Sequence, residues 1–190
     1  MTEPSMGPTR FLDTGETIYR FGERFLVRCP RCERCAVVIP SGHGDETLPQ
    51  LIAPHRLVCA ACGHTREWDG APYASATSVT NGAITYPAAE IRAHPRRGKG
   101  MGGLVIGAPF DWYFRLPVWL QTPCCSGTLW AYNAEHLAFL RGFVTAQLRE
   151  RIPPASNRSL ASRLPHWMIT AKNRDEVTRG LDRLERLLVE

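Results

Sequence analysis

Two Cys-x-x-Cys pairs constrain this chain more than any other feature of its sequence. The first is Cys29-Pro-Arg-Cys32 and the second is Cys59-Ala-Ala-Cys62. β-prone residues flank both pairs, so we expect each pair at the tip of a β-hairpin. Two intervening residues let both sulfurs of a pair reach one ion, and Gly63 permits the positive φ that such a tight turn often needs. The spacing therefore predicts a zinc ribbon, in which a tetrahedral Zn²⁺ has four thiolate ligands and a purely structural role.

Other metal ligands and another chemistry remain as alternatives. Cys35 follows Cys32 at the same spacing, so these two form an alternative first pair, although Cys35 also suits the start of an apolar strand. His64 is an alternative to Cys62, at a less usual spacing, and His43 lies in a polar stretch where a surface role is expected. A redox dithiol normally opens a helix, and neither cysteine pair precedes a helical pattern.

The overall composition is that of a soluble globular protein. Of the 190 residues, 44% are hydrophobic and 22% are charged. No apolar run approaches the roughly 18 residues that a membrane span needs, and the first eight residues lack the basic start and apolar core of a secretion signal. Seven cysteines in such a chain indicate a reducing compartment, where paired cysteines more often bind metal than form disulfides. We therefore expect a cytoplasmic protein with no membrane partner.

The charge balance is mildly basic. The net charge is +5 and the isoelectric point is about 9.0, which suits a nucleic-acid or acidic partner. A glycine-rich stretch, residues 92–103, contains Arg96, Arg97 and Lys99, and these three are candidate phosphate contacts for nucleic acid. The stretch lacks the Gly-Lys-Ser/Thr ending of a nucleotide-binding loop. A solvated loop without a ligand is the alternative.

The order of patterns along the chain predicts an α+β fold. Residues 17–69 form the ribbon, with a strand from Thr17 to Arg28 and another from Cys35 to Pro40. Residues 1–16, rich in Pro, Gly, Thr and Ser, are expected to be a flexible leader. Residues 70–108 are expected to be an irregular and partly β region, in which a turn at residues 80–83 joins two short strands. Residues 109–190 complete the chain with an aromatic-rich segment and a small helical domain.

The aromatic-rich segment is followed by two adjacent cysteines. Five aromatic residues gather in the segment, where a packed core is favoured over a stacking platform for bases: Phe110, Trp112, Tyr113, Phe114 and Trp119. Cys124 and Cys125 are expected to be buried thiols near Trp130. The alternative is a second metal that they share with Cys35 or His136.

The C-terminal part has helical periodicity. Asn133 suits an N-cap, and the apolar residues that follow predict one helix reaching Arg151. Ser159 suits the cap of a short helix. Asn173 and Glu176 have the spacing of a capping box for the last helix, whose other face alternates basic and acidic residues: Arg179, Asp182, Arg183, Glu185 and Arg186. That alternation is typical of a solvated, ion-paired face.

The chain resembles two groups of proteins. Through Cys29, Cys32, Cys59 and Cys62, residues 17–69 resemble the zinc ribbons of transcription factors, RNA polymerase subunits and many small bacterial proteins. The C-terminal half resembles an uncharacterised group of bacterial zinc-ribbon proteins in the segments 116–125, 129–140, 159–168 and 171–174. The resemblance implies a two-part protein of bacterial type with one structural zinc ion, and it supplies no catalytic residues.

These observations favour a binding protein over an enzyme. We expect a non-catalytic zinc-ribbon protein that acts as a macromolecular binding module, with nucleic acid ahead of protein as its partner. A protein–protein adaptor with purely structural zinc is the alternative. Glu135-His136 is the closest approach to a catalytic grouping, and a single His on a helix is more often a packed or capping residue.

Overall fold

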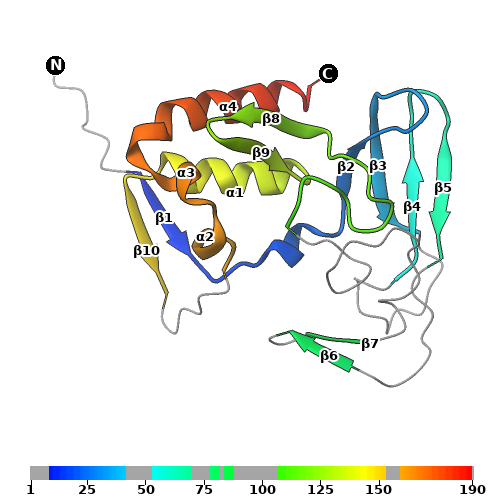
Figure 1. Cartoon of the computed structure of the whole chain (residues 1–190), viewed down its shortest axis with the longest axis horizontal. Coiled ribbons are helices and arrows are strands. Elements are labelled where there is room, and N and C mark those ends of the chain that lie inside the picture. Colours follow the sequence, from blue (N-terminus) through cyan, green and yellow to red (C-terminus); the bar gives the residue numbers. More distant parts are fainter. Residues whose placement is uncertain are drawn as a thin grey trace, which may run out of the picture. The chain divides into compact units, whose positions relative to one another are not determined.

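A computed structural model describes residues 9–41, 53–69, 78–81, 84–87, 107–152 and 159–189. The chain divides into two compact units. We call residues 23–117 the ribbon unit, and residues 1–22 together with 118–190 the helical unit. Strands dominate the described part of the ribbon unit, and the α-helices of the described residues belong to the helical unit (Figure 1). The predicted α+β class is confirmed.

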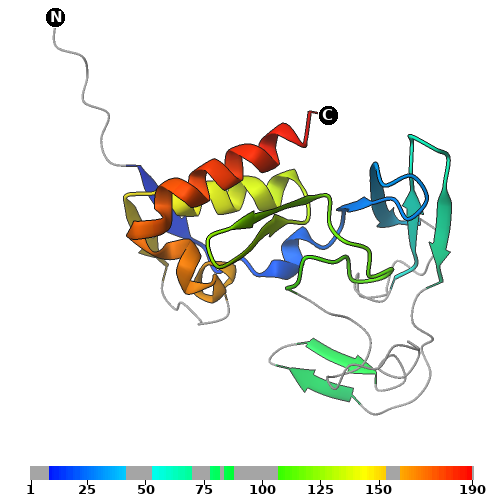
Figure 2. The ribbon, with the colours of Figure 1, turned by 45° about the horizontal axis from the view of Figure 1, so that its top comes forward.

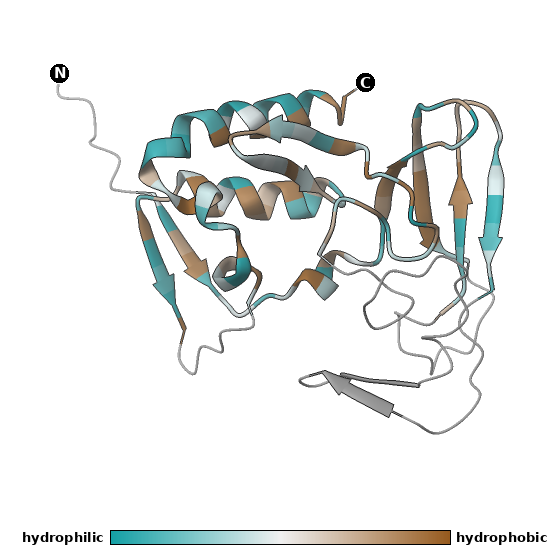
Figure 3. Cartoon of the chain, in the orientation of Figure 1, coloured by the Kyte–Doolittle hydropathy of each residue, from teal (hydrophilic) through white to brown (hydrophobic). Residues whose placement is uncertain are grey.

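The ribbon unit contains a four-stranded antiparallel sheet in the order β2-β3-β4-β5. Its strands are β2 (Phe25–Arg28), β3 (Cys35–Pro40), β4 (His55–Val58) and β5 (Thr65–Trp68). The first and second pairs of strands are the two predicted hairpins, and pairing of β3 with β4 joins them into one sheet. The strand β3 is largely apolar, whereas β5 is polar over most of its length (Figure 3). A separate antiparallel pair, β6 (Ser78–Asn81) and β7 (Ile84–Pro87), flanks the predicted turn.

The aromatic-rich segment contributes to the core of the ribbon unit. Trp112, Tyr113 and Phe114 are buried. The Phe25 ring meets the rings of Trp112 and Tyr113 at centroid distances of 5.1 and 5.8 Å, and His55 stacks on Tyr113 at 3.7 Å. These three aromatic residues therefore pack as a core and offer no surface for stacking bases. They belong with the ribbon, although the sequence groups them with the helical domain.

A buried carboxylate holds the loop that carries these rings. Asp111 is fully buried, and its side chain accepts hydrogen bonds from the backbone N–H groups of Tyr113, Phe114 and Leu116 at 2.9, 2.7 and 2.6 Å. Burial raises the pKa of this carboxyl, while the three N–H donors and the charge of Arg115 lower it. The side chain therefore satisfies three backbone donors that the turn would otherwise bury unpaired.

The helical unit is built from two long helices and a hairpin. Its hairpin consists of β8 (Leu120–Cys124) and β9 (Gly127–Ala131), and its long helices are α1 (Ala134–Thr145) and α4 (Arg174–Arg186). The helices pack side by side, and the hairpin packs against α4 (Figure 2). Leu137, Leu140 and Val144 of α1 are buried, as are Val177, Leu181 and Leu184 of α4, so each helix buries one stripe. The shorter elements are η1 (Ile18–Phe21), α2 (Leu160–Arg163), α3 (His166–Ile169) and η2 (Ala171–Asn173).

Part of the predicted leader is ordered in a sheet. The strand β1 (Arg10–Asp13) pairs in parallel with β10 (Leu148–Arg151). The Phe11 ring packs edge-on against Phe139 and Phe143, at 5.3 and 5.2 Å. Asp13 is buried and accepts a hydrogen bond of 2.7 Å from the Ser159 hydroxyl. These contacts come from residues far along the chain, so the local composition did not indicate the strand.

Two predicted elements are shorter than the sequence suggests. The helix that begins after Asn133 ends at Thr145, and β10 follows it. The backbone N–H groups of Gln147 and Leu148 donate to Thr9 O. These hydrogen bonds to another segment take the place of helical hydrogen bonds, so the chain continues as a strand. The predicted strand from Thr17 is a 3₁₀ turn, η1, and only its end forms β2. Among the described residues, no helix combines the length and the apolar character needed to cross a membrane.

Candidate metal centre

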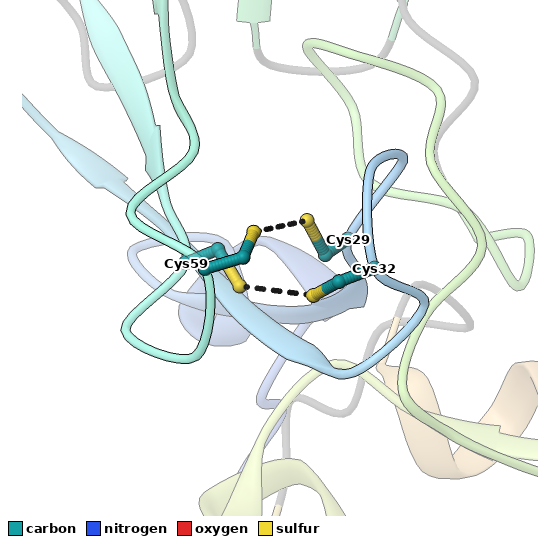
Figure 4. Close-up of side chains that lie close together, drawn as sticks. Cys29, Cys32 and Cys59 are labelled. Carbon is teal, nitrogen blue, oxygen red and sulfur yellow. Dashed lines mark hydrogen bonds between the residues drawn. The ribbon is translucent and has the colours of Figure 1, made fainter.

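Four cysteines meet between the two turns of the ribbon. Cys29 Sγ lies 3.7 Å from Cys62 Sγ, and Cys32 Sγ lies 3.6 Å from Cys59 Sγ. Figure 4 shows the thiols of the two turns facing one another. In a tetrahedral site with Zn–S bonds of about 2.3 Å, neighbouring sulfurs are about 3.8 Å apart. The four thiols are therefore spaced as ligands of one metal ion, and no ligand position would remain open.

The two turns have the same backbone geometry. Glu33 N donates to Cys29 O and Cys29 N donates to Arg34 O, and the second turn repeats both bonds, from Gly63 N to Cys59 O and from Cys59 N to His64 O, all four at 2.9 Å. The residue after each second cysteine is left-handed, with φ of 61° at Glu33 and 69° at Gly63. The positive φ predicted for Gly63 is confirmed. The matched turns present two thiols each towards the same point.

The electrostatics of the cluster favour ionisation of one thiol at a time. A hydrogen bond from the backbone of Arg34 lowers the pKa of Cys32, to about 6. At Cys62 the backbone hydrogen bond from His64 also lowers the pKa, but desolvation and the neighbouring thiols outweigh it and raise the pKa to about 12. Several thiolates this close together require a cation among them. The donor set thus suits a soft divalent metal such as zinc.

The alternative ligands lie outside this cluster. Cys35 begins β3, half-buried, with its carbonyl oxygen 3.8 Å from Cys59 Sγ. His64 takes part in the second turn through its backbone. His43 lies outside the described residues. The three predicted nucleic-acid contacts also lie outside them: Arg96, Arg97 and Lys99.

A second group of side chains with the chemistry of metal ligands occurs in the helical unit. Cys124, Cys125 and Glu176 each offer a ligand atom within 4.8 Å of the others. Sequence reasoning did not include Glu176, because Asn173 and Glu176 have the spacing of a capping box. The structure contains no such box: Asn173 Nδ2 donates to Trp167 O at 3.0 Å, and Glu176 Oε1 accepts from Cys125 N at 2.7 Å.

His136, an alternative ligand for a second metal, is a packed residue of the helical unit. Its ring is buried and stacks on Phe21 at a centroid distance of 4.8 Å. Its Nδ1 accepts a hydrogen bond from Tyr132 N at 3.2 Å, and its backbone N–H donates to the predicted N-cap, Asn133 Oδ1, at 2.9 Å. Among the described residues, His136 belongs to neither cysteine cluster. Burial lowers its pKa to about 3.

Comparison with models of known protein families, with curated proteins and with solved structures gives no significant match.

Proposed function

We propose that this protein is a non-catalytic binding module, in which structural zinc at Cys29, Cys32, Cys59 and Cys62 holds the ribbon and nucleic acid is the partner. The spacing of the four thiols supports the zinc assignment. A closed shell of four thiolates leaves zinc no position at which to bind water or substrate. The metal therefore acts by stabilising the two turns and the surface around them.

The partner assignment is supported by two exposed arginines of the ribbon unit. Arginines of the helical unit form ion pairs within it, as in the pair between Arg141 and Asp182 at 2.6 Å. Arg31, in the first cysteine turn, and Arg56, in β4, are exposed, and neither forms an ion pair within the described ranges. Exposed guanidinium groups without a carboxylate partner suit phosphate groups, which accept their hydrogen bonds in pairs.

The experiment is fluorescence anisotropy with labelled DNA and RNA of mixed sequence, added to the zinc-loaded protein at about 50 and 200 mM salt. Each phosphate contact to duplex DNA makes binding about 3.5-fold weaker over this range. The double variant R31A/R56A should weaken binding at low salt and reduce the salt effect by about 12-fold. The variant R163A/R186A removes the same charge from two exposed arginines of the helical unit, and we expect it to bind as the wild type does.

The predicted loop is tested in the same assay. Neutralising Arg96, Arg97 and Lys99 together should also lower affinity and salt dependence, because three cations are removed. Absence of binding at 50 mM salt would contradict the nucleic-acid assignment and leave the structural zinc unaffected. Equal affinities for R31A/R56A and R163A/R186A would contradict the role of the ribbon arginines.

An exposed apolar set favours a protein partner as the second candidate. Leu12, Leu148 and Ile152, on and beside the β1–β10 sheet, are 50, 41 and 47% exposed. Clustered apolar side chains of this size are typical of protein-binding surfaces. Sedimentation of the protein with and without nucleic acid separates the two candidates. Self-association through the apolar set would persist at 200 mM salt, whereas binding to nucleic acid would be weakened, because phosphate contacts are weak at that salt concentration.

A further inference from the structure

The end of the β8–β9 hairpin brings two adjacent thiols to the same side of the chain. Cys124 pairs with Gly127 across the hairpin, so residues 125 and 126 form the turn. Cys125 has a φ of 51°, a left-handed value that residues other than glycine seldom adopt. Neighbouring side chains of a regular strand point to opposite faces, but here the two Sγ atoms lie 3.7 Å apart. The turn therefore presents a pair of thiols.

A carboxylate from the first turn of α4 joins these thiols. Glu176 Oε1 accepts a hydrogen bond of 2.7 Å from Cys125 N, and the carbonyl oxygen of Glu176 lies 3.8 Å from Cys124 Sγ. The two sulfurs and a carboxylate oxygen all lie within 4.8 Å of one another. The carboxylate is thus held beside the thiols by the backbone of the turn, and it retains lone pairs for another partner.

A glycine allows α4 to approach the thiols this closely. Gly180 lies four residues after Glu176 and shares its helix face. A Cβ atom at Gly180 would lie 2.7 Å from Leu129 Cδ2 and 3.4 Å from Cys124 Sγ. Glycine is among the least favourable residues inside a helix. Its presence is explained by the close approach that positions Glu176 beside Cys125.

The spacing of the three groups suits zinc. A tetrahedral zinc ion places two thiolate sulfurs about 3.8 Å apart, and a sulfur and a carboxylate oxygen about 3.6 Å apart. The sulfurs already have this separation. Cys125 and Glu176 are exposed, and the carboxylate oxygen lies within 4.8 Å of both sulfurs. Thiolate ligands select zinc over magnesium or calcium.

The surrounding charge also fits a bound divalent cation. Two thiolates and a carboxylate carry three negative charges, and zinc would leave one. Arg183 is fixed next to the site, because its guanidinium donates to Thr122 Oγ1 and to Pro123 O, each at 3.2 Å. Its single positive charge offsets the remaining negative one.

We propose that Cys124, Cys125 and Glu176 bind a second zinc ion. The three protein ligands leave the fourth position for water or an exchangeable ligand, unlike the closed four-thiol shell of the ribbon. This site is half-exposed and has fewer thiolates, so its zinc exchanges faster than the zinc of the ribbon. The assignment is independent of the proposed nucleic-acid binding.

The test is zinc stoichiometry and affinity, measured on the full chain kept reduced throughout. Apo-protein is titrated with Zn²⁺ against a chromophoric chelator, and native mass spectrometry counts the bound ions. The wild type should bind two zinc ions and release the second first. The variant C124S/C125S should bind one, whereas C35S, which removes a half-buried thiol outside both clusters, should bind two.

The carboxylate is tested with a matched pair of variants. Both E176Q and E135Q neutralise an exposed glutamate in the first turn of a helix. E176Q should lower the affinity for the second zinc ion at least about tenfold, because loss of even an outer-shell partner of a metal ligand has that effect. E135Q should leave that affinity unchanged. Helical circular dichroism verifies that each variant folds. One zinc ion at saturation in the wild type, two in C124S/C125S, or equal second affinities in E176Q and E135Q would each overturn the proposal.

Discussion

The buried imidazole of His136 should make the stability of the helical unit depend on pH. Burial lowers its pKa from 6.5 to about 3. The folded state therefore holds His136 neutral at pH values where the unfolded chain protonates it. Stability contributed by the neutral ring is complete above about pH 6.5 and is lost progressively as the pH falls towards 3.

The size of this effect follows from the two pKa values. With one group titrating at 6.5 in the unfolded chain and at about 3 in the folded chain, linkage lowers the unfolding free energy by about 0.8 kcal/mol at pH 6 and about 3.4 kcal/mol at pH 4. The difference between the two pH values is about 2.5 kcal/mol. The variant H136Q removes the titration and keeps an acceptor for Tyr132 N.

The assay is urea unfolding at pH 4, 5 and 6, followed by circular dichroism at the helical band, because the α-helices of the described residues belong to the helical unit. Between pH 6 and 4, the unfolding free energy of H136Q should fall by about 2.5 kcal/mol less than that of the wild type. Protonation of the ribbon thiols is common to both proteins and cancels in this comparison. H166Q removes an exposed imidazole and is the matched control. Equal losses for H136Q and the wild type would refute the reasoning.

Three further substitutions test the packing of each unit by urea unfolding. S159A should cost about 1–3 kcal/mol, because it removes both a helix N-cap and a hydrogen bond to the buried carboxylate of Asp13, and a cost near zero would contradict the ordered β1. D111A should cost about 3 kcal/mol or more, because three backbone N–H groups lose their acceptor, and a cost below about 1 kcal/mol would show that the loop is held otherwise. R141A removes two partly exposed ion pairs with α4, to Asp182 and Glu185, and should cost only about 1 kcal/mol; a cost of several kcal/mol would contradict the surface character of these pairs.

The ribbon was predictable because its determinants are local. Each cysteine pair and the residues around it specify a hairpin and a turn within about ten positions, so the four-thiol cluster follows from sequence spacing. The caps at Asn133 and Ser159 were predictable for the same reason, since each bonds to a backbone N–H three residues on. The extent of α1 was not, because pairing with Thr9 decides where it ends.

The remaining features depend on contacts between distant parts of the chain. Phe11 is ordered by Phe139 and Phe143, which no local pattern near residue 11 reveals. Glu176 joins Cys124 and Cys125 only because α4 packs against the hairpin. The spacing of Asn173 and Glu176 favoured a cap on local grounds, and the tertiary contacts of both side chains prevailed over it.

The most direct test of the account is X-ray absorption spectroscopy of zinc bound to the C124S/C125S variant. This variant lacks the thiols of the second cluster and keeps the four cysteines of the ribbon. Four sulfur ligands at about 2.3 Å are predicted, with no oxygen or nitrogen in the first shell. A shell with light-atom ligands, or fewer than four sulfurs, would contradict the structural zinc ribbon on which the proposed function rests.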